Sequence, residues 1–487
     1  MLFTEPTFLF LFLPLLLALY FAPSSTGSRE HATYGNCLLL VASVIFYAKG
    51  GGSFTWLMLG SIAFNYVMGI AVDRARDSGR AKRVLAFAIT VNLVVLGIFK
   101  YANFFADNVN TLFLALRVHP LVVPRVLLPI GISFYTFHAI SYVIDVYRRD
   151  ATAQKSPVHA ALYLLLFPQL IAGPIIRYRD LADQLARRIV TVDDFAYGVR
   201  RFIIGLAKKV LVANTVAGPA DRIFALPAAQ LSASHAWLAI VCYTLQIYFD
   251  FSGYSDMAIG LGRMFGFRFP ENFRWPYIAE SVQEFWRRWH ISLSTWFRDY
   301  LYVPLGGNRV SEGRTYANLV TVFFLCGLWH GASWNFVIWG LWHGAFLVIE
   351  RVTTRGRDRS PASTASFGRH VLRHAYTMVV VMVGWVFFRA DTLPDAVAFL
   401  RSLLGLATPV RGPFTIDWYL TRELWVAIVA GVIGSMPWLP ALARREPRGW
   451  AAPALATASV ASLTALLVAA VMQMAARTYN PFIYFRF

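Results

Sequence analysis

Long apolar runs with few charges recur along the whole chain, and they constrain its fold more than any other feature. A helix needs about 20 apolar residues to cross a hydrocarbon core of about 30 Å. Only 15% of the 487 residues are charged, against about 25% in ordinary soluble domains. We therefore predict an all-α, polytopic integral membrane protein, a helical bundle of roughly 11–14 membrane helices. The candidate spans lie near residues 6–23, 33–48, 54–72, 84–99, 121–144, 158–176, 202–218, 235–262, 317–329, 331–350, 374–390, 423–440 and 452–475.

The basic residues cluster in short loops between the apolar runs. A formal net charge of +19 would suggest a nucleic-acid partner in a soluble protein. Here the distribution follows the positive-inside rule, which places loops rich in Lys and Arg on the cytoplasmic side. We therefore predict membrane lipid as the surroundings, no nucleic-acid partner, and C-terminal residues on the side opposite the cytoplasm. The clusters are Arg74 to Arg83, Arg148 with Arg149 and Lys155, Arg351 to Arg373, and Arg444 with Arg445 and Arg448.

A polar segment rich in Arg and Ser, residues 353–369, is the main interruption of the apolar pattern. It has no helical periodicity, so we expect a cytoplasmic loop. No internal repeat of about 20–50 residues is visible, and we predict a single membrane-embedded domain over residues 1–487. Its core spans about residues 120–350, and a C-terminal helical extension follows at residues 371–487.

Three histidines lie in or beside apolar segments: His290, His330 and His343. An ionisable group at membrane depth is costly unless it is paired or lines a cavity, so these residues are candidates for function. His330 and His343 belong to two copies of the pentapeptide GLWHG, 13 residues apart. On one continuous helix they would lie about 20 Å apart and point about 140° apart. They can share a site only if the helix breaks, at Gly331 or Gly340; otherwise His343 is a hydrogen-bonded or interfacial side chain.

His330 has the setting of a catalytic residue. It follows Trp329 and precedes Gly331, where backbone can approach a substrate closely. Imidazole, with an ordinary pKa of about 6.5, can accept a proton from a hydroxyl group and donate one to a leaving group. Cys326, one helical turn earlier, raises the alternative of an acyl-thioester. Nothing nearby would orient a base for that chemistry, so we expect Cys326 to be a small apolar filler.

The segment 284–303 mixes aromatic and charged residues, as membrane-interface helices do. Two interpretations stay open. The segment is an anchor, or its arginines bind the phosphates of a cytoplasmic acyl donor, for which the planar guanidinium is well matched. The candidate donor-binding or channel residues are Arg287, Arg288, Arg298, Asp299 and Trp329.

Other polar residues favour structural roles. Asp250 and Asp256 would point roughly 120° apart on a helix, so they do not form an acid/base pair on one helix face. We expect at least one of them to be a structural partner of an arginine. His370 and His374 have i, i+4 spacing without the glutamate of a zinc motif, and we predict no metal site. GxxxxGK[ST], HExxH and GxSxG motifs are missing from the sequence, so ATP hydrolysis, zincin proteolysis and α/β-hydrolase chemistry lack their usual marks.

Five longer segments resemble one known family. They are LPIGISFYTFHAISYVIDVYRR (128–149), FPQLIAGPIIRYRDL (167–181), YFDFSGYSDMAIGLGRMFGF (248–267), NFRWPYIAESVQEFWRRWHISLSTWFRDYLYVPLGGNR (272–309) and CGLWHGASWNFVIWGLWHG (326–344). Together they resemble the membrane-bound O-acyltransferase family, most closely its bacterial alginate O-acetyltransferase branch. The resemblance extends from the first residues to the C-terminal NPFIYFRF.

The resemblance implies opposed cytoplasmic and periplasmic funnels around an essential catalytic histidine, which falls on His330. A second catalytic position, Asn or Asp elsewhere in the family, falls on His290, which we expect to orient or polarise the acyl carbonyl. The implied enzyme takes an acyl group from acetyl-CoA or another thioester, without a bound cofactor. It moves this group across the bacterial inner membrane for O-acetylation of an extracytoplasmic polysaccharide. An SGNH-hydrolase-like acetyltransferase partner is implied outside, and the acceptor stays open among alginate, cellulose, peptidoglycan and other glycans.

The last residues read FxYxxF, from Phe482 through Tyr484 to Phe487. They resemble a C-terminal motif of polysaccharide and teichoic-acid acylation systems in which the tyrosine is a candidate acyl relay. A phenol ester is more activated than an alkyl ester and hydrolyses more slowly than a thioester. The alternative is an aromatic anchor at the membrane interface.

Two non-enzymatic functions compete with acyl transfer. A transporter or flippase would use the same buried polar residues to pass a substrate without chemistry. A non-catalytic scaffold of a polysaccharide-export complex would need the chain but not His330. Consumption of a thioester distinguishes the enzyme from both.

Overall fold

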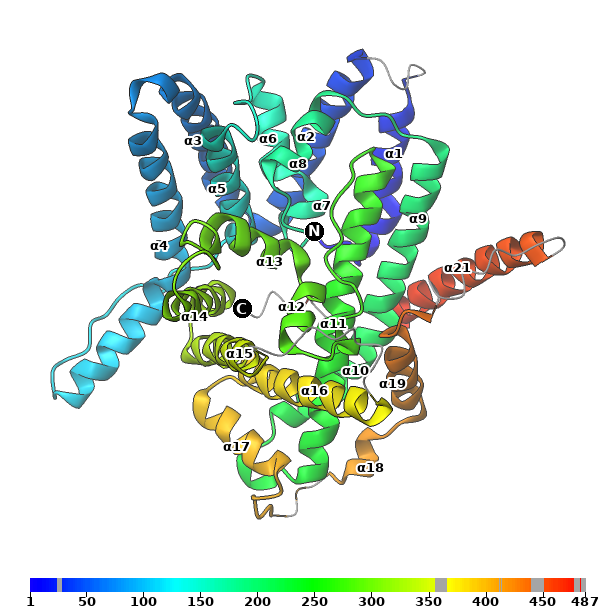
Figure 1. Cartoon of the computed structure of the whole chain (residues 1–487). Coiled ribbons are helices and arrows are strands. Elements are labelled where there is room, and N and C mark those ends of the chain that lie inside the picture. Colours follow the sequence, from blue (N-terminus) through cyan, green and yellow to red (C-terminus); the bar gives the residue numbers. More distant parts are fainter. Residues whose placement is uncertain are drawn as a thin grey trace. The chain divides into compact units, whose positions relative to one another are not determined.

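The computed structural model describes residues 1–23, 29–354, 366–410, 412, 414–438, 451–476 and 482. Every regular element in this part of the chain is a helix, which confirms the predicted all-α fold (Figure 1). The label η marks short π- and 3-10 helices. The first elements are η1 (Phe8–Phe12), α1 (Leu13–Phe21), α2 (Arg29–Gly51), α3 (Phe54–Arg74), η2 (Arg76–Ser78), α4 (Ala81–Ala115), α5 (Ile132–Arg148), α6 (Pro157–Leu165), α7 (Phe167–Leu170), α8 (Tyr178–Ala186) and α9 (Val192–Ala207). The later elements are η3 (Lys208–Ala213), α10 (Asn214–Phe224), η4 (Ala228–Gln230), α11 (Ala233–Met264), η5 (Pro276–Ile278), α12 (Val282–Arg288), α13 (Ile291–Phe297), η6 (Arg298–Tyr302), α14 (Glu312–His330), α15 (Trp334–Thr353), α16 (Phe367–Arg389), α17 (Leu393–Leu403), α18 (Ile416–Tyr419), α19 (Arg422–Gly434) and α21 (Ala451–Ala476).

Seven helical stretches of the described residues are long and apolar enough to cross a membrane. They confirm a multi-pass membrane protein. Other predicted spans form shorter helices, such as α1 with 9 residues and α19 with 13. The seven stretches are Ala32–Gly51, Phe54–Arg74, Ala81–Ala115, Val192–Phe224, Trp334–Thr353, Phe367–Arg389 and Ala452–Ala476.

One predicted span, residues 121–144, is helical only in its second half. α5 begins at Ile132, and the part of the predicted span before it contains two prolines, Pro124 and Pro129, which lack the N–H that a helix requires. The side chain of Asn103 binds the backbone there instead, since its Oδ1 accepts a hydrogen bond from the N–H of Val126 at 3.0 Å. The apolar composition of this stretch therefore did not suffice to predict a helix.

The described chain divides into two compact units. The first comprises Met1–Phe202 and Tyr254–Pro270, and the second comprises Ile203–Gly253 and Glu271–Phe487. Two of the three boundaries fall inside helices, so α9 and α11 each contribute residues to both units, and the third follows Pro270 in a loop.

Aromatic packing forms the core of the first unit. Phe3 stacks on Tyr254 with ring centroids 4.6 Å apart, and its ring also contacts Phe46 at 5.8 Å. In the same unit Arg201 pairs with Asp256 at 2.7 Å. This ion pair confirms the expectation that one of the two carboxylates in the apolar run binds an arginine.

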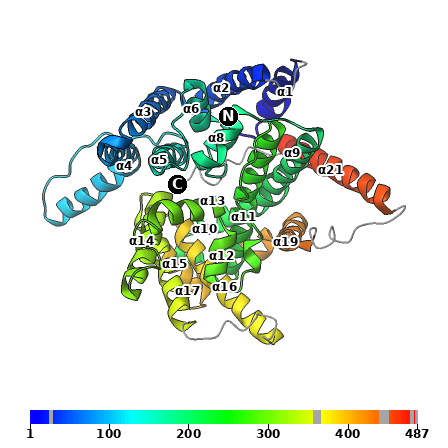
Figure 2. The ribbon, with the colours of Figure 1, turned by 45° about the horizontal axis from the view of Figure 1, so that its top comes forward.

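In the second unit, α14 and α15 form a helical hairpin whose two helices run side by side (Figure 2). Their close approach requires glycine. A β-carbon at Gly327 would overlap the backbone carbonyl oxygen of Phe336, and one at Gly340 would overlap that of Phe323. Small residues at such crossings allow two membrane helices to pack backbone against backbone.

Candidate functional site

His330 and His343 meet on one tryptophan. α14 ends at His330, Gly331 takes an extended conformation (φ −161°, ψ 151°), and α15 begins at Trp334. The reversed chain places the Trp339 ring between the two imidazoles, with centroid distances of 4.9 Å to His330 and 5.3 Å to His343. Of the two breaks considered, the one at Gly331 occurs, while Gly340 stays within α15.

His290 joins the same aromatic cluster from another element. It is fully buried and precedes α13. Its ring lies 4.6 Å from Phe251 and 6.2 Å from Trp329, and Trp329 in turn lies 4.8 Å from His330. The structure therefore brings together three of the predicted site residues, His290, Trp329 and His330.

The backbone of His290 is unusual. Its φ of 44° and ψ of 53° lie in the left-handed region, which side chains other than glycine adopt at a cost. Such residues persist where surrounding contacts hold them, and they cluster at functional sites. The conformation therefore agrees with a functional role for His290.

Asn272, which sequence reasoning did not single out, binds His290. Its Oδ1 lies 3.1 Å from Nδ1 of His290 and accepts hydrogen bonds from Ser292, from Oγ at 2.9 Å and from the backbone N–H at 3.3 Å. Asn272 is also fully buried. It lies 18 residues before His290, across a loop, so neither helical nor strand spacing relates the two positions. The only available signal was a polar residue within the segment 272–309.

The arginines of segment 284–303 do not form one site. Arg288 pairs with Glu284 at 2.7 Å, and Arg298 pairs with its neighbour Asp299 at 2.7 Å. Arg287 is exposed. Of these arginines, Arg287 therefore offers its guanidinium most readily to a ligand.

Glu350 holds α12 in place next to these residues. Its carboxylate oxygens accept hydrogen bonds from the N–H groups of Val282 at 2.6 Å and Gln283 at 3.0 Å. Ser281 caps the same helix, since its Oγ accepts from the N–H of Glu284 at 3.0 Å. Acceptors at a helix N-terminus satisfy N–H groups that lack partners within the helix. α15 thus fixes the helix that leads to His290.

The C-terminal tail reaches this cluster at one described residue. The Phe482 ring is buried and lies 6.0 Å from the ring of Phe251, which contacts His290. Tyr484, the candidate relay, lies outside the described residues.

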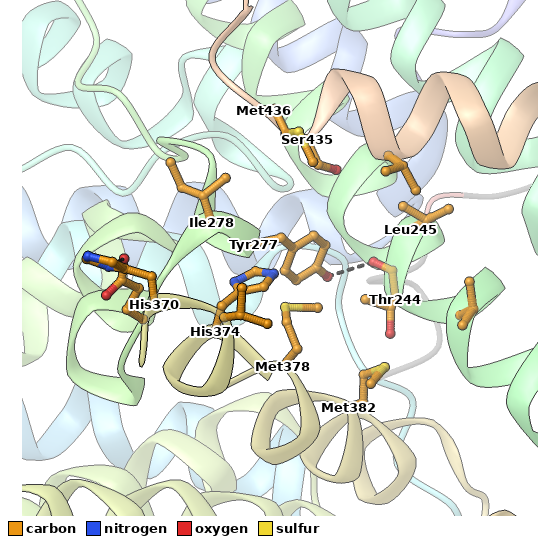
Figure 3. Close-up of a pocket in the computed structure, with 14 residues that line it drawn as sticks. Thr244, Leu245, Tyr277, Ile278, His370, His374, Met378, Met382, Ser435 and Met436 are labelled. Carbon is orange, nitrogen blue, oxygen red and sulfur yellow. Dashed lines mark hydrogen bonds and ion pairs between the residues drawn. The ribbon is translucent and has the colours of Figure 1, made fainter. Parts of the chain in front are cut away.

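A cavity of about 490 Å³ opens in the second unit between α11, α16, α19 and η5 (Figure 3). One end is polar, because His370 Nδ1 lies 2.8 Å from Glu280 Oε1 and His374 follows one turn later. Met378 and Met382 continue the lining along the same helix.

Tyr277 connects this cavity with the histidine cluster. Its hydroxyl donates to the carbonyl oxygen of Thr244 at 2.6 Å (Figure 3). Its ring lies 6.2 Å from Trp289, the residue before His290. One layer of aromatic side chains therefore links the cavity wall to the histidines.

Comparisons with known proteins identify the family to which this chain belongs. Residues 153–389, which include His290 and His330, match the membrane-bound O-acyltransferase family. The chain is similar to a protein of Azotobacter vinelandii named probable alginate O-acetylase AlgI, with 44% identity over 100% of both chains. Its identity to the protein of that name from Pseudomonas aeruginosa is 41%, again over 100% of both. A peptidoglycan O-acetyltransferase of Helicobacter pylori is 36% identical, over 83% of this chain and 80% of its own length.

Proposed function

Because the chain belongs to the membrane-bound O-acyltransferase family and is an O-acyltransferase, we propose that it transfers acetyl groups from a cytoplasmic thioester, acetyl-CoA, towards an extracytoplasmic polysaccharide. The bacterial inner membrane is the compartment in which such a donor and such an acceptor lie on opposite sides. The full-length similarity to proteins named for alginate O-acetylation supports a polysaccharide acceptor. No resident cofactor is needed, because the thioester already carries an activated acyl group.

The convergence of His290, Trp329 and His330 carries this proposal. Acyl transfer requires a proton to leave the attacking hydroxyl and a proton to reach the departing thiolate. Imidazole performs both tasks near neutral pH. His330 is therefore the proposed general acid/base, with His290 as its partner in the same cluster.

The cavity supports a route for the donor. Its polar end is formed by Glu280 and His370, and His370 directly follows the predicted cytoplasmic loop 353–369 in the sequence. The lining also includes Tyr277. An apolar cavity of this size with a few polar groups is suited to a small-molecule ligand. We place the thioester arm of the donor in this cavity, and we assign its phosphates to exposed Arg287 rather than to Arg288, which Glu284 holds.

Tyr484 is the proposed acyl relay between the cluster and the outside. The contact of Phe482 with Phe251 supports this role. Phe482 lies only two residues before Tyr484 in the sequence, and the Phe251 ring that it contacts also contacts His290. An SGNH-hydrolase-like acetyltransferase outside the membrane would then receive the acyl group and complete transfer to the polysaccharide.

The test is thioester consumption by the purified protein in lipid nanodiscs with radiolabelled acetyl-CoA. We expect release of free CoA together with label on the protein tail or on an added acceptor glycan. Glycan movement without CoA release would indicate a transporter or flippase. If deletion of the chain abolishes polysaccharide acetylation but His330→Asn acetylates at the wild-type level, the protein is a scaffold.

A further inference from the structure

The buried oxygen of Asn272 is a hydrogen-bond hub. Its Oδ1 accepts from both the backbone N–H and the Oγ of Ser292, and it lies 3.1 Å from Nδ1 of His290. The backbone oxygen of Asn272 also accepts a hydrogen bond from the N–H of Ile291 at 2.9 Å. Asn272 thus contacts the His290 side chain and also binds the two residues that follow it.

These bonds determine which side-chain atom of Asn272 faces His290. Oxygen and nitrogen of an amide are assigned from the hydrogen-bond network. The backbone N–H of Ser292 can only donate, so the Asn272 atom that it contacts is the oxygen. An amide oxygen can only accept, so Nδ1 of His290 is the donor.

We infer that Asn272 is a positioning residue that keeps the proton of neutral His290 on Nδ1 and the lone pair on Nε2, so that His290 accepts the hydroxyl proton in acyl transfer. This inference rests on the proposed acyl transfer, but it moves the proton-accepting step from His330 to His290 and leaves His330 as the proton donor. Fixing the tautomer through the other ring nitrogen is a general way to orient a functional histidine.

The surroundings of Nε2 fit a proton acceptor. This buried atom makes no hydrogen bond to any described residue. The ring is held edge-on to Phe251, with an interplanar angle of 88°. The left-handed backbone of His290 is held as well, because its carbonyl oxygen accepts from the N–H of Ser294 at 3.0 Å. Ring rotation would break the bond to Asn272, so Nε2 is kept in one direction.

The reaction balances with two histidines. The hydroxyl proton passes to Nε2 of His290 while the hydroxyl oxygen forms a bond to the acyl carbon. The carbon–sulfur bond breaks, and the thiolate takes a proton from the imidazolium form of His330, which becomes neutral. His290 then releases its extra proton to water and His330 takes one up from water, so a hydroxyl and a thioester yield an ester and a thiol. This assignment differs from the sequence expectation that His290 polarises the acyl carbonyl, since that role needs an N–H where the neutral ring has a lone pair.

The first test compares Asn272→Leu with Asn272→Asp in the nanodisc assay, per amount of monodisperse protein. Asn272→Leu removes the acceptor, and we expect kcat to fall at least about tenfold with little change in KM for acetyl-CoA. Asn272→Asp keeps an acceptor and adds a charge that favours the imidazolium. We expect it to retain activity while the acidic limb of kcat moves to higher pH by roughly one unit.

Ser292→Ala is the matched control, because it removes another hydrogen bond to the same oxygen. We expect wild-type kcat within about threefold and an unmoved acidic limb. If Asn272 has only a structural role, Asn272→Leu lowers the yield of folded protein and Asn272→Asp leaves the acidic limb of the kcat–pH profile in place. An unmoved acidic limb in Asn272→Asp therefore overturns the inference.

A second test compares the histidines directly. If His290 accepts the proton, His290→Asn loses at least as much kcat as His330→Asn. If His290→Asn retains clearly more activity, the carbonyl-polarising role is correct and the inference is wrong. Failure of the proposed function is distinguishable, because the wild-type protein would then consume no thioester.

Discussion

Nζ of Lys209 lies 2.9 Å from Oδ1 of Asp250, and the two side chains are only 5% and 2% exposed. Lys209 belongs to a membrane-spanning stretch, where a single charge is costly and a paired one is tolerated. Asp250 lies one residue before Phe251, the ring that contacts His290. This pair therefore gives Asp250 a structural role next to the site, while Asp256 is the carboxylate that pairs with an arginine.

Breaking this pair should destabilise the protein. Lys209→Met and Asp250→Asn each remove one partner of a buried ion pair, and we expect each to lower stability by about 3–5 kcal/mol. The double substitution should recover part of that loss. Thermal unfolding of the detergent-solubilised protein measures both. Exposed Lys82→Met is the control, and equal melting temperatures for Lys209→Met and Lys82→Met would contradict a structural pair.

His330→Asn should abolish most acyl transfer. We expect a loss of roughly two or more orders of magnitude in kcat with normal insertion, because asparagine cannot carry out the proton transfer assigned to the imidazole of His330. His343→Asn is the matched control, since His343 contacts the same Trp339 ring. Release of CoA from acetyl-CoA is the measurement, and near-normal release by His330→Asn would refute the assignment.

Gly327→Ala should impair catalysis through helix packing. The added β-carbon would overlap the carbonyl oxygen of Phe336, which forces α14 and α15 apart and moves His330. A misplacement of about 1 Å at reacting groups can cost about 100-fold in rate. Gly97→Ala is the control, because nothing lies within 4 Å of its added β-carbon. Similar kcat values for the two variants would show that the hairpin adapts.

Met382→Trp should weaken donor binding. The larger side chain fills part of the cavity in which we place the thioester arm, so KM for acetyl-CoA should rise by about tenfold, equivalent to about 1.4 kcal/mol. Val379→Trp adds the same group to an exposed position of the same helix and should leave KM unchanged. Identical KM values for both variants would place the donor elsewhere.

Tyr484→Phe separates the relay from the anchor. It keeps an aromatic ring for the membrane interface and removes the oxygen that would carry the acyl group. We expect polysaccharide acetylation to fall at least about tenfold while the protein stays inserted. The measurement is the ester content of the surface glycan in a strain with Tyr484→Phe, and a strain with Tyr147→Phe is the control. Wild-type ester content would leave the tail as an anchor.

Local composition was enough to predict the membrane-embedded, all-α fold. Charged groups are costly in hydrocarbon, so the apolar runs marked most helices, and α11 follows the predicted span 235–262 closely. The interrupted span 121–144 shows the limit of hydropathy, because prolines break a helix whatever its apolar content. His290 and His330 were identified because ionisable residues stand out in apolar sequence.

The tertiary structure alone decided how these residues meet. The GLWHG repeat left open whether His330 and His343 share a site, and the extended Gly331 with the close α14–α15 crossing brought both to Trp339. Asn272 became visible only through its hydrogen bond to His290. The physical reason is range: burial and helix formation depend on neighbours a few residues away, whereas a hydrogen bond across 18 residues depends on how the intervening chain packs.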